Sequence, residues 1–392
     1  MADRRMCFDG RRALVPAQPS HLIMTAQSAD RPGGMMSPAP PELTSGDVFA
    51  YPRRSARHRR LTRWTVVLAA LSAALLHAAA PQASAATHKE LLNNRLYVVN
   101  AYADTVSVID TRTNTVVGSP IPVGDDPGAV ATDTLRGRAY VTNRLSNTVS
   151  VIDTRTDTVV GSPIAVGGLP AGVATDPLRG RAYVTNANSG TVSVIDTNTN
   201  TVIGSPIAVG STPGAVATDT LRGRAYVTNG GSDTVSVIDT NTNTVLGSPI
   251  PVGDFPFNVA TDSVRGRAYV TNDFAGTVSV INTNTNALVG SPISVGSNPI
   301  GVATDALRGR AYVTNSHSGT VSVIDTNTNA LVGSPISVGS NPNGVATDAL
   351  RGRAYVTNGG SDTVSVIDTN TNKVIGSPIP VGDGPGGVAL GR

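Results

Sequence analysis

The stretch Arg138-Ala139-Tyr140-Val141-Thr142-Asn143 decides the fold, because it returns along the chain every 43 residues. Six of its seven copies read Tyr-Val-Thr-Asn at their centre, and the first reads Tyr97-Val98-Val99-Asn100. A period of this length indicates a solenoid or a propeller, in which neighbouring units build a continuous core. The tyrosines that mark the copies are Tyr97, Tyr140, Tyr183, Tyr226, Tyr269, Tyr312 and Tyr355.

Outward from the tyrosine, each unit alternates apolar and polar residues. In the unit that begins at Gly172, runs rich in β-branched residues occupy 172–175, 181–185 and 191–195, and a last run at 201–204 leads into 207–209. Gly, Pro, Asn and Asp separate the runs, and no window has helical periodicity. We therefore predict four strands per unit, called a to d in chain order.

The two ends of the repeat region are complementary. The first unit begins at strand b, at 95–100, and has no strand a, whereas the chain ends with an unpartnered strand a at 387–390. A closed ring gains from this split, because the last strand completes the first sheet and only short, protected edges remain. The sequence predicts an all-β fold, a seven-bladed β-propeller with four antiparallel strands per blade. We expect the C-terminal strand to close the ring by joining the N-terminal blade.

The repeated motifs resemble those of the YVTN β-propeller repeat family. The likeness covers about residues 90–392 and consists of Tyr-Val-Thr-Asn, then Val-Ser-Val-Ile-Asp, then Val-Gly, with departures at Val99, Asn258, Asn282 and Leu390. The family occurs in surface-layer and other secreted microbial proteins. The resemblance implies the propeller fold and a place outside the cell, and it is weak as a guide to a particular function.

The N-terminal residues have the composition of an export signal. An arginine-rich segment at 53–63 precedes an apolar run at 64–80, and Ala83-Ser84-Ala85 forms a small-x-small cleavage site. We expect a disordered extension at 1–52, which includes alternative start codons at Met35 and Met36, a secretion signal peptide at 53–85, and the propeller at 86–392. The protein is then secreted or held in the cell envelope. An uncleaved anchor is the alternative, although the apolar run is shorter than the roughly 20 residues that a membrane span needs.

The sign of the net charge also changes at the end of residues 1–85, which we call the leader. Residues 1–85 contain 11 Lys and Arg against 5 Asp and Glu, whereas the remainder contains 19 against 22, a net charge of −3. The basic character of the chain therefore belongs to the leader, and we expect no nucleic-acid partner and no stable membrane insertion after cleavage. The sequence leaves the oligomeric state open.

Comparison of the seven units separates two sets of loops. The a–b loops (Thr-Asp-x-Leu-Arg-Gly-Arg) and the c–d loops (Asp-Thr-Asn-Thr-Asn) hardly vary, and strand order places both sets on one face of the ring. We expect the repeated Arg and Asp of this face to pair within each blade, and Asp196 to open an Asx-type turn rather than a calcium loop. The b–c and d–a loops vary, and they share the opposite face, which we call the variable face.

One sector of the variable face has the side chains of a binding site. Three Phe are present after the leader: Phe255 and Phe257 in one d–a loop, and Phe274 in the b–c loop of the same blade. The candidate ligand-binding residues are Asp254, Phe255, Phe257, Asp273, Phe274, Ile300 and His317. Aromatic rings beside carboxylates suit a small molecule, a glycan or a peptide. The alternative is that Phe255 and Phe257 pack between blades.

The inventory of catalytic groups is small. His88 lies in the tail before the first strand, so His317 is the one histidine of the predicted ring, and the single cysteine, Cys7, lies within residues 1–85. We therefore predict no catalytic residue, no metal site and no cofactor. The expected function is a binding or scaffold protein that acts on an unidentified protein, peptide or glycan at the cell surface. Two alternatives remain, a surface-layer-like structural component and a lactonase- or lyase-like propeller enzyme in which His317 and Asp273 act together.

Overall fold

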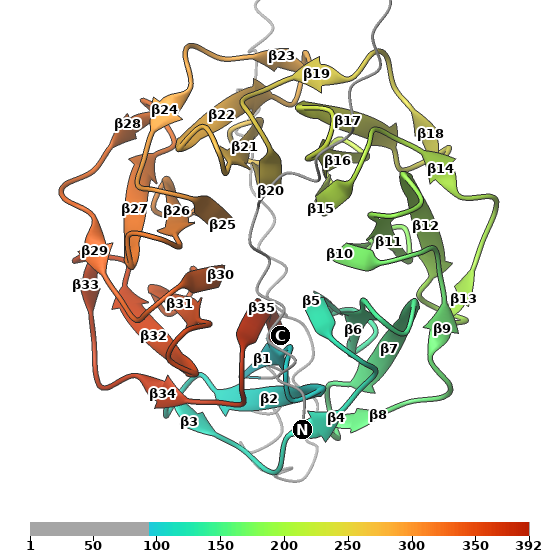
Figure 1. Ribbon diagram of the computed structural model, residues 1–392, viewed down its shortest axis with the longest axis horizontal. Helices are drawn as coiled ribbons and strands as arrows, with labels where there is room; N and C mark the ends of the chain where they lie inside the picture. Colours follow the sequence, from blue (N-terminus) through green and yellow to red (C-terminus); the bar gives the residue numbers. More distant parts are fainter. Residues whose placement is uncertain (1–93, 392) are drawn as a thin grey trace, which may run out of the picture. The chain divides into compact units, whose positions relative to one another are not determined.

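A computed structural model describes residues 94–391. The disordered extension and the signal peptide expected at 1–85 lie outside these residues, as does the start of the propeller expected at 86–93. Every regular element of the described part is a β-strand, and the strands form seven sheets arranged as the blades of a ring (Figure 1). The predicted seven-bladed β-propeller is confirmed. Within residues 94–391 no helix is long and apolar enough to cross a membrane.

Each blade runs outward from the ring axis in the order a, b, c, d, with antiparallel pairing throughout. The innermost a strands are β35 (Pro385–Gly391), β5 (Pro127–Asp133), β10 (Pro170–Asp176), β15 (Pro213–Asp219), β20 (Pro256–Asp262), β25 (Pro299–Asp305) and β30 (Pro342–Asp348). The b strands, which carry the tyrosine motif, are β1 (Arg95–Asn100), β6 (Arg138–Asn143), β11 (Arg181–Asn186), β16 (Arg224–Asn229), β21 (Arg267–Asn272), β26 (Arg310–Asn315) and β31 (Arg353–Asn358). We number the blades 1 to 7 in the order of their b strands.

The c strands are β2 (Thr105–Asp110), β7 (Thr148–Asp153), β12 (Thr191–Asp196), β17 (Thr234–Asp239), β22 (Thr277–Asn282), β27 (Thr320–Asp325) and β32 (Thr363–Asp368). The outer d strand of each blade is broken into two short pieces, a detail that the sequence pattern did not predict. The pairs are β3 (Thr115–Val116) and β4 (Ile121–Pro122), β8 (Thr158–Val159) and β9 (Ile164–Ala165), β13 (Thr201–Val202) and β14 (Ile207–Ala208), β18 (Thr244–Val245) and β19 (Ile250–Pro251), β23 (Ala287–Leu288) and β24 (Ile293–Ser294), β28 (Ala330–Leu331) and β29 (Ile336–Ser337), and β33 (Lys373–Val374) and β34 (Ile379–Pro380).

The break in the d strand has a local cause. In blade 3, Gly204 adopts a left-handed φ of 68° and Pro206 has no amide hydrogen, so the ladder cannot continue between β13 and β14. Both pieces still pair with β12, one at each end. The outer edge of each blade therefore has no long strand on which another chain could add.

The ring closes as the split repeat predicts. Strand β35, from the C-terminus, pairs antiparallel with β1 and completes blade 1, with Tyr97 opposite Ala389 and Leu96 opposite Leu390. In Figure 1 the last and first described strands lie side by side in one sheet. Apolar residues of neighbouring blades then pack into seven clusters between the sheets, one of which joins residues of β1 to Tyr355 in blade 7.

The tyrosine ties each blade to the next. The Tyr140 ring is fully buried, and its hydroxyl donates to Asn200 Oδ1 in the c–d loop of blade 3, at 2.8 Å. Asn200 adopts a left-handed φ of 56°, which asparagine tolerates better than most residues. Burial raises the pKa of the Tyr269 and Tyr312 hydroxyls to about 12, so both stay protonated donors.

The threonine of the motif fills a bulge and bonds the next blade. In blade 3, a register shift between Pro170 and Val173 leaves a bulge in the a strand. Thr185 Oγ1 accepts from the Gly172 amide at 2.8 Å and donates to the Gly214 carbonyl of blade 4 at 2.6 Å. This inter-blade bond recurs at every copy except the first, where Val99 has no hydroxyl.

The motif's asparagine organises the variable face. Asn143 Nδ2 donates to Thr148 Oγ1 and Ser150 Oγ, each at 3.0 Å, and so fixes the start of strand c. Its Oδ1 accepts the Gly124 amide of the d–a loop at 3.2 Å. A Cβ on Gly124 would lie 2.7 Å from Asn143 Cγ, so the glycine before each d–a loop is needed for this close approach.

Candidate functional site

The two faces of the ring carry opposite charge. Of the charged residues in 94–391, eight aspartates and one arginine belong to the b–c and d–a loops, which gives the variable face a net charge of −7. These residues are Asp104, Asp125, Asp126, Asp233, Asp254, Asp273, Asp362, Asp383 and Arg144. The opposite face, formed by the a–b and c–d loops and the strand ends beside them, has 13 aspartates against 16 Arg and Lys, a net charge of +3. A field of this polarity favours cationic groups at the variable face.

The first arginine of each a–b loop pairs with an aspartate of its own blade, as expected. Arg136 Nη1 lies 3.0 Å from Oδ2 of the fully buried Asp133 in its own blade, and the five later copies match it within 0.1 Å. The predicted Asx-type turn is also present, because Asp196 Oδ1 accepts the amides of Asn198 and Thr199. Among the second arginines of the a–b loops, Arg138 and Arg310 pair with Asp153 and Asp325, whereas Arg224 and Arg353 bond carbonyls of the next blade.

On the variable face, Phe255 is held in a strained conformation. It has a left-handed φ of 51°, and its amide donates to Asp233 Oδ1 of blade 4 at 2.9 Å. All seven d–a loops are left-handed at this position, which holds Asp126, Leu169, Thr212, Asn298, Asn341 and Gly384 in the other copies, so the conformation belongs to the loop type. A phenylalanine here costs on the order of 1 kcal/mol in backbone energy.

The strained residue forms an aromatic pair. The Phe255 and Phe274 rings stack with centroids 4.6 Å apart and an interplanar angle of 19°. Phe255 is half-buried, with its ring edge near Gly230 of the neighbouring blade, whereas Phe274 is 52% exposed. The pair therefore presents an aromatic surface to solvent, which is the geometry that a flat apolar group of a ligand needs.

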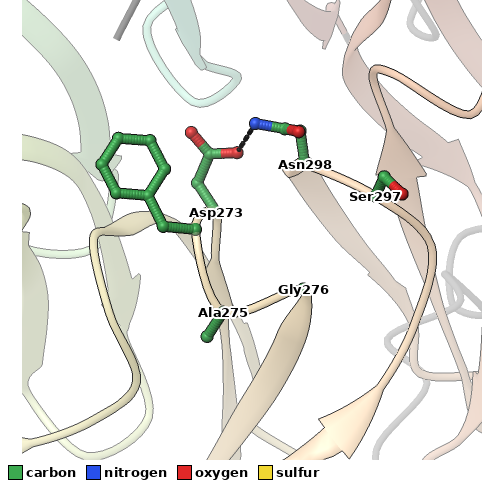
Figure 2. A pocket seen from close by; sticks show the side chains of 6 residues that line it. Asp273, Ala275, Gly276, Ser297 and Asn298 are labelled. Carbon is green, nitrogen blue, oxygen red and sulfur yellow. Dashed lines mark hydrogen bonds between the residues drawn. The ribbon is translucent and has the colours of Figure 1, made fainter. Parts of the chain in front are cut away.

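A buried carboxylate lies next to this pair. Asp273 is 8% exposed, and its Oδ1 accepts Asn298 Nδ2 at 2.9 Å (Figure 2). Asn298 Oδ1 in turn accepts Nδ1 of the exposed His317. Burial raises the pKa of Asp273 above its usual range, while the Asn298 hydrogen bond and the nearby His317 act in the opposite direction. Asn298 thus links the two residues that the sequence suggested as a possible acid–base pair.

An open hollow of about 370 Å³ surrounds the carboxylate. Figure 2 shows the Asp273 carboxylate and the Asn298 amide facing each other, with Ser297 beside Asn298 and Gly276 below them. The volume lies at the small end of the range for ligand sites, roughly 300 to 1,000 Å³. A second hollow, of about 420 Å³ between β3 and β34 at the outer rim, has no ionisable side chain in its lining.

The remaining predicted residues are more dispersed. Phe257 is 38% exposed and Ile300 is half-buried, and both are the second residue of an a strand, β20 and β25. Their carbonyls accept the inter-blade threonine bonds from Thr228 and Thr271. Asp254 is exposed in the loop just before Phe255. The structure brings Phe255 to Phe274 and links Asp273 to His317 through Asn298. Among the described residues, no hydrogen bond joins Asp254, Phe257 or Ile300 to this group.

Sequence reasoning missed two residues. Asn298, which joins Asp273 to His317, reads in the sequence as an ordinary Ser-Asn-Pro loop residue. Tyr102 is 65% exposed on the variable face of blade 1, where its ring covers Gly384. The signal for Tyr102 was its loop, Ala-Tyr-Ala-Asp, since no other b–c loop contains a tyrosine.

The arrangement offers the contacts of a binding site. It offers an aromatic surface, a desolvated carboxylate with one free oxygen among the described residues, and a surrounding acidic field. In residues 94–391 no three His, Cys, Asp or Glu side chains converge as a metal site would require. A protonated amine or guanidinium attached to an apolar group would meet both the ring and the carboxylate.

Comparisons with known proteins support the fold and go no further. No protein-family model and no curated protein matches the chain. Hydrazine synthase of Kuenenia stuttgartiensis is 22% identical with a TM-score of 0.61, covering 69% of this chain and 91% of that one. A functionally unknown protein from Desulfotomaculum acetoxidans DSM 771 is 18% identical with a TM-score of 0.65, covering 76% and 98%. Dihydro-heme d1 dehydrogenase NirN in complex with DHE is 17% identical with a TM-score of 0.56, covering 72% and 63%.

Proposed function

We propose that this chain is a non-catalytic binding protein of the cell exterior, secreted or held in the envelope, which recognises its partner with the variable face. The observation that carries the proposal is the Phe255–Phe274 stack beside the buried carboxylate of Asp273. It lies on the face where the units differ, whereas the opposite face repeats its ion pairs from blade to blade. The resemblance to YVTN repeat proteins supports the extracellular location.

The site also favours one kind of ligand. A net charge of −7 on the variable face repels anionic partners and attracts cationic ones. At the hollow, Asp273 Oδ2 accepts no hydrogen bond from the described residues, so it can receive an ammonium or guanidinium donor. Phe274 then covers the apolar part of the same group. The partner that fits is a polypeptide segment with exposed lysine or arginine side chains.

A panel of labelled probes tests the proposal by fluorescence anisotropy. The probes are an oligolysine peptide, an oligoglutamate peptide, a chitosan oligomer and a neutral glucan oligomer. We expect oligolysine to bind, and Phe274→Ser to weaken that binding by about tenfold or more. Val264→Ser is the matched control, because Val264 is 72% exposed in the same blade but on the opposite face.

Three results would decide against this account. Binding of no probe to the wild-type protein, or equal loss in Phe274→Ser and Val264→Ser, would remove the variable face as the recognition surface. Preference for the chitosan oligomer over oligolysine would replace the peptide partner with an amino-sugar polymer while keeping the same site.

A further inference from the structure

The face opposite the candidate site carries a ring of exposed apolar side chains. Each of the six a–b loops holds one at the same position, and each is between 63% and 72% exposed. Blade 1 has no such loop, because its a and b strands come from opposite ends of the chain. We call these residues the apolar crown: Leu135, Leu178, Leu221, Val264, Leu307 and Leu350.

Packing inside the ring does not account for the crown. The residue just before it differs between loops, as Thr134, Pro177, Ser263 and Ala306 show, whereas the crown position is Leu in five loops and Val in the sixth. Both positions belong to the same short loop. An apolar side chain that recurs in all six loops while most of it faces solvent is typical of a surface that contacts a partner.

Hydrogen bonds hold the crown loops against one another. Arg136 Nη1 donates to the Pro177 carbonyl of the next blade at 2.9 Å, which is the carbonyl just before crown residue Leu178. Arg179 reaches the Thr220 carbonyl at 3.1 Å in the same way, and the later blades repeat the contact. Because equivalent positions of a ring lie at one height along its axis, the six side chains form a flat, rigid platform.

Exposed cations flank this platform. Arg112 and Arg155 replace the asparagine of later c–d loops. Their side chains are 51% and 72% exposed, and each also pairs with an aspartate of its own blade, Asp110 or Asp153. Lys373 is exposed at the start of β33 on the same face. These three residues belong to the adjacent blades 7, 1 and 2, and the face as a whole has a net charge of +3.

We propose that the apolar crown docks the propeller flat on an anionic lipid bilayer. A planar array of leucines surrounded by Arg and Lys matches the boundary between acyl chains and headgroups, where apolar side chains bury and cations meet lipid phosphates. The acidic variable face then points away from the membrane, towards its partner. A second copy of the same face is a poorer fit, because two surfaces of net positive charge repel each other.

Vesicle flotation tests the proposal with the full-length protein. The probes are phosphatidylcholine vesicles with and without phosphatidylglycerol. We expect binding to the anionic vesicles that weakens as salt rises to physiological strength, and weak binding to the neutral ones. The triple variant Leu178→Ser, Leu221→Ser, Leu307→Ser should lower the bound fraction by about tenfold or more while its melting temperature stays unchanged.

Phe274→Ser separates this surface from the candidate binding site, because it should leave vesicle binding unchanged. Two results would overturn the membrane proposal. One is failure of the wild-type protein to float with anionic vesicles. The other is equal flotation of the crown variant. Crown-dependent self-association in sedimentation velocity, without vesicle binding, would assign the platform to a second copy of the chain instead.

Discussion

The Tyr355 hydroxyl, in the last b strand, donates to Asn114 Oδ1, in the first c–d loop, at 3.2 Å. The contact spans 241 residues of sequence, yet it is the same contact that Tyr140 makes with Asn200 between neighbouring units. The junction between blades 7 and 1 is therefore bonded like the others at this position. Blade 1 differs from the others because its inner strand, β35, comes from the C-terminal end of the chain. The ring closes through the pairing of β35 with β1.

Removal of the closing strand should open the ring. Deletion of residues 386–392 removes nearly all of β35 and leaves β1 without its inner partner. Because apolar side chains of blades 7 and 2 lose their cover, we expect a loss of unfolding free energy greater than about 4 kcal/mol, or aggregation through the exposed edge. Thermal melting checks this, and a truncated protein with an unchanged melting temperature would show that the ring does not depend on β35.

Blade 1 also lacks two hydroxyls that every other blade has. Thr132 Oγ1 donates to the Leu390 carbonyl at 2.6 Å, and later copies repeat this bond around the ring axis, but Leu390 cannot donate in turn. Val99 likewise replaces the threonine that bonds the next blade elsewhere. Both missing hydroxyl groups, at Leu390 and Val99, belong to blade 1, in which the two ends of the chain pair.

Val99→Thr should therefore stabilise the protein. Threonine has nearly the same shape as valine, and its hydroxyl would meet the Gly128 carbonyl, the counterpart of Ala171 and Gly214 in later copies. We expect a gain of about 1 kcal/mol in denaturant unfolding. The reverse change, Thr142→Val, is the control and should lose about as much or more. A loss of stability in Val99→Thr would mean that this interface holds its blades differently from the others.

Most of the fold was predictable because it repeats. Seven copies of the tyrosine motif, six of them Tyr-Val-Thr-Asn, predicted the number of blades, and the split between the β1 and β35 ends predicted the closure. The broken d strand was not, because Thr201-Val202 and Ile207-Ala208 read as one β-rich run until the left-handed Gly204 is known. The role of the motif's threonine was equally hidden, since Thr185 acts on a bulge that the sequence does not mark.

Asp273→Asn should change how stability depends on pH. The pKa of Asp273 is raised in the fold by burial, so the native state binds its proton more readily than the unfolded state does. Protonated Asp273 therefore adds to the free energy of unfolding at pH values below the ordinary aspartate pKa, near 3.9. This stabilisation is lost as the pH rises through the pKa of Asp273 in the folded protein. At neutral pH we expect the asparagine variant to melt at a higher temperature than wild type, because its amide needs no desolvated charge.

The difference should shrink as the pH falls through the raised pKa of Asp273, where the wild-type carboxylate takes up its proton. Melting curves over this range check the prediction. A constant difference between the two proteins at every pH would show that Asp273 does not titrate in the fold, and would weaken its assignment as the carboxylate that receives a cation.

Single substitutions of Phe255 and Phe274 show whether each ring is a ligand contact or part of the packing between blades. Phe255→Asn keeps a residue that accepts the left-handed φ of 51° and removes the ring, so it should change unfolding free energy by less than about 1 kcal/mol. Phe274→Ser removes a half-exposed ring and should cost about as little. If either ring is instead part of the packing between blades, its removal should cost on the order of 3 kcal/mol or more. Thermal melts decide between the two before any ligand is identified.

The sequence predicted which residues the candidate site contains, but it did not predict how their side chains are arranged. The three phenylalanines stood out because the rest of the ring has none, and the variable loops pointed to their face. The sequence gives no sign that Phe255 stacks on Phe274, because their separation in the chain does not fix how two loops of one blade approach. Nor does it indicate that Asn298 lies between Asp273 and His317.

Hydrogen–deuterium exchange of the protein, free and saturated with oligolysine, tests the central claim that the variable face is the recognition surface. We predict slower exchange in the loops at 253–258, 273–276 and 296–298 on binding, and unchanged exchange in the a–b loop of the same blade at 263–266. Protection confined to the a–b and c–d loops, or no protection in any loop, would contradict the account.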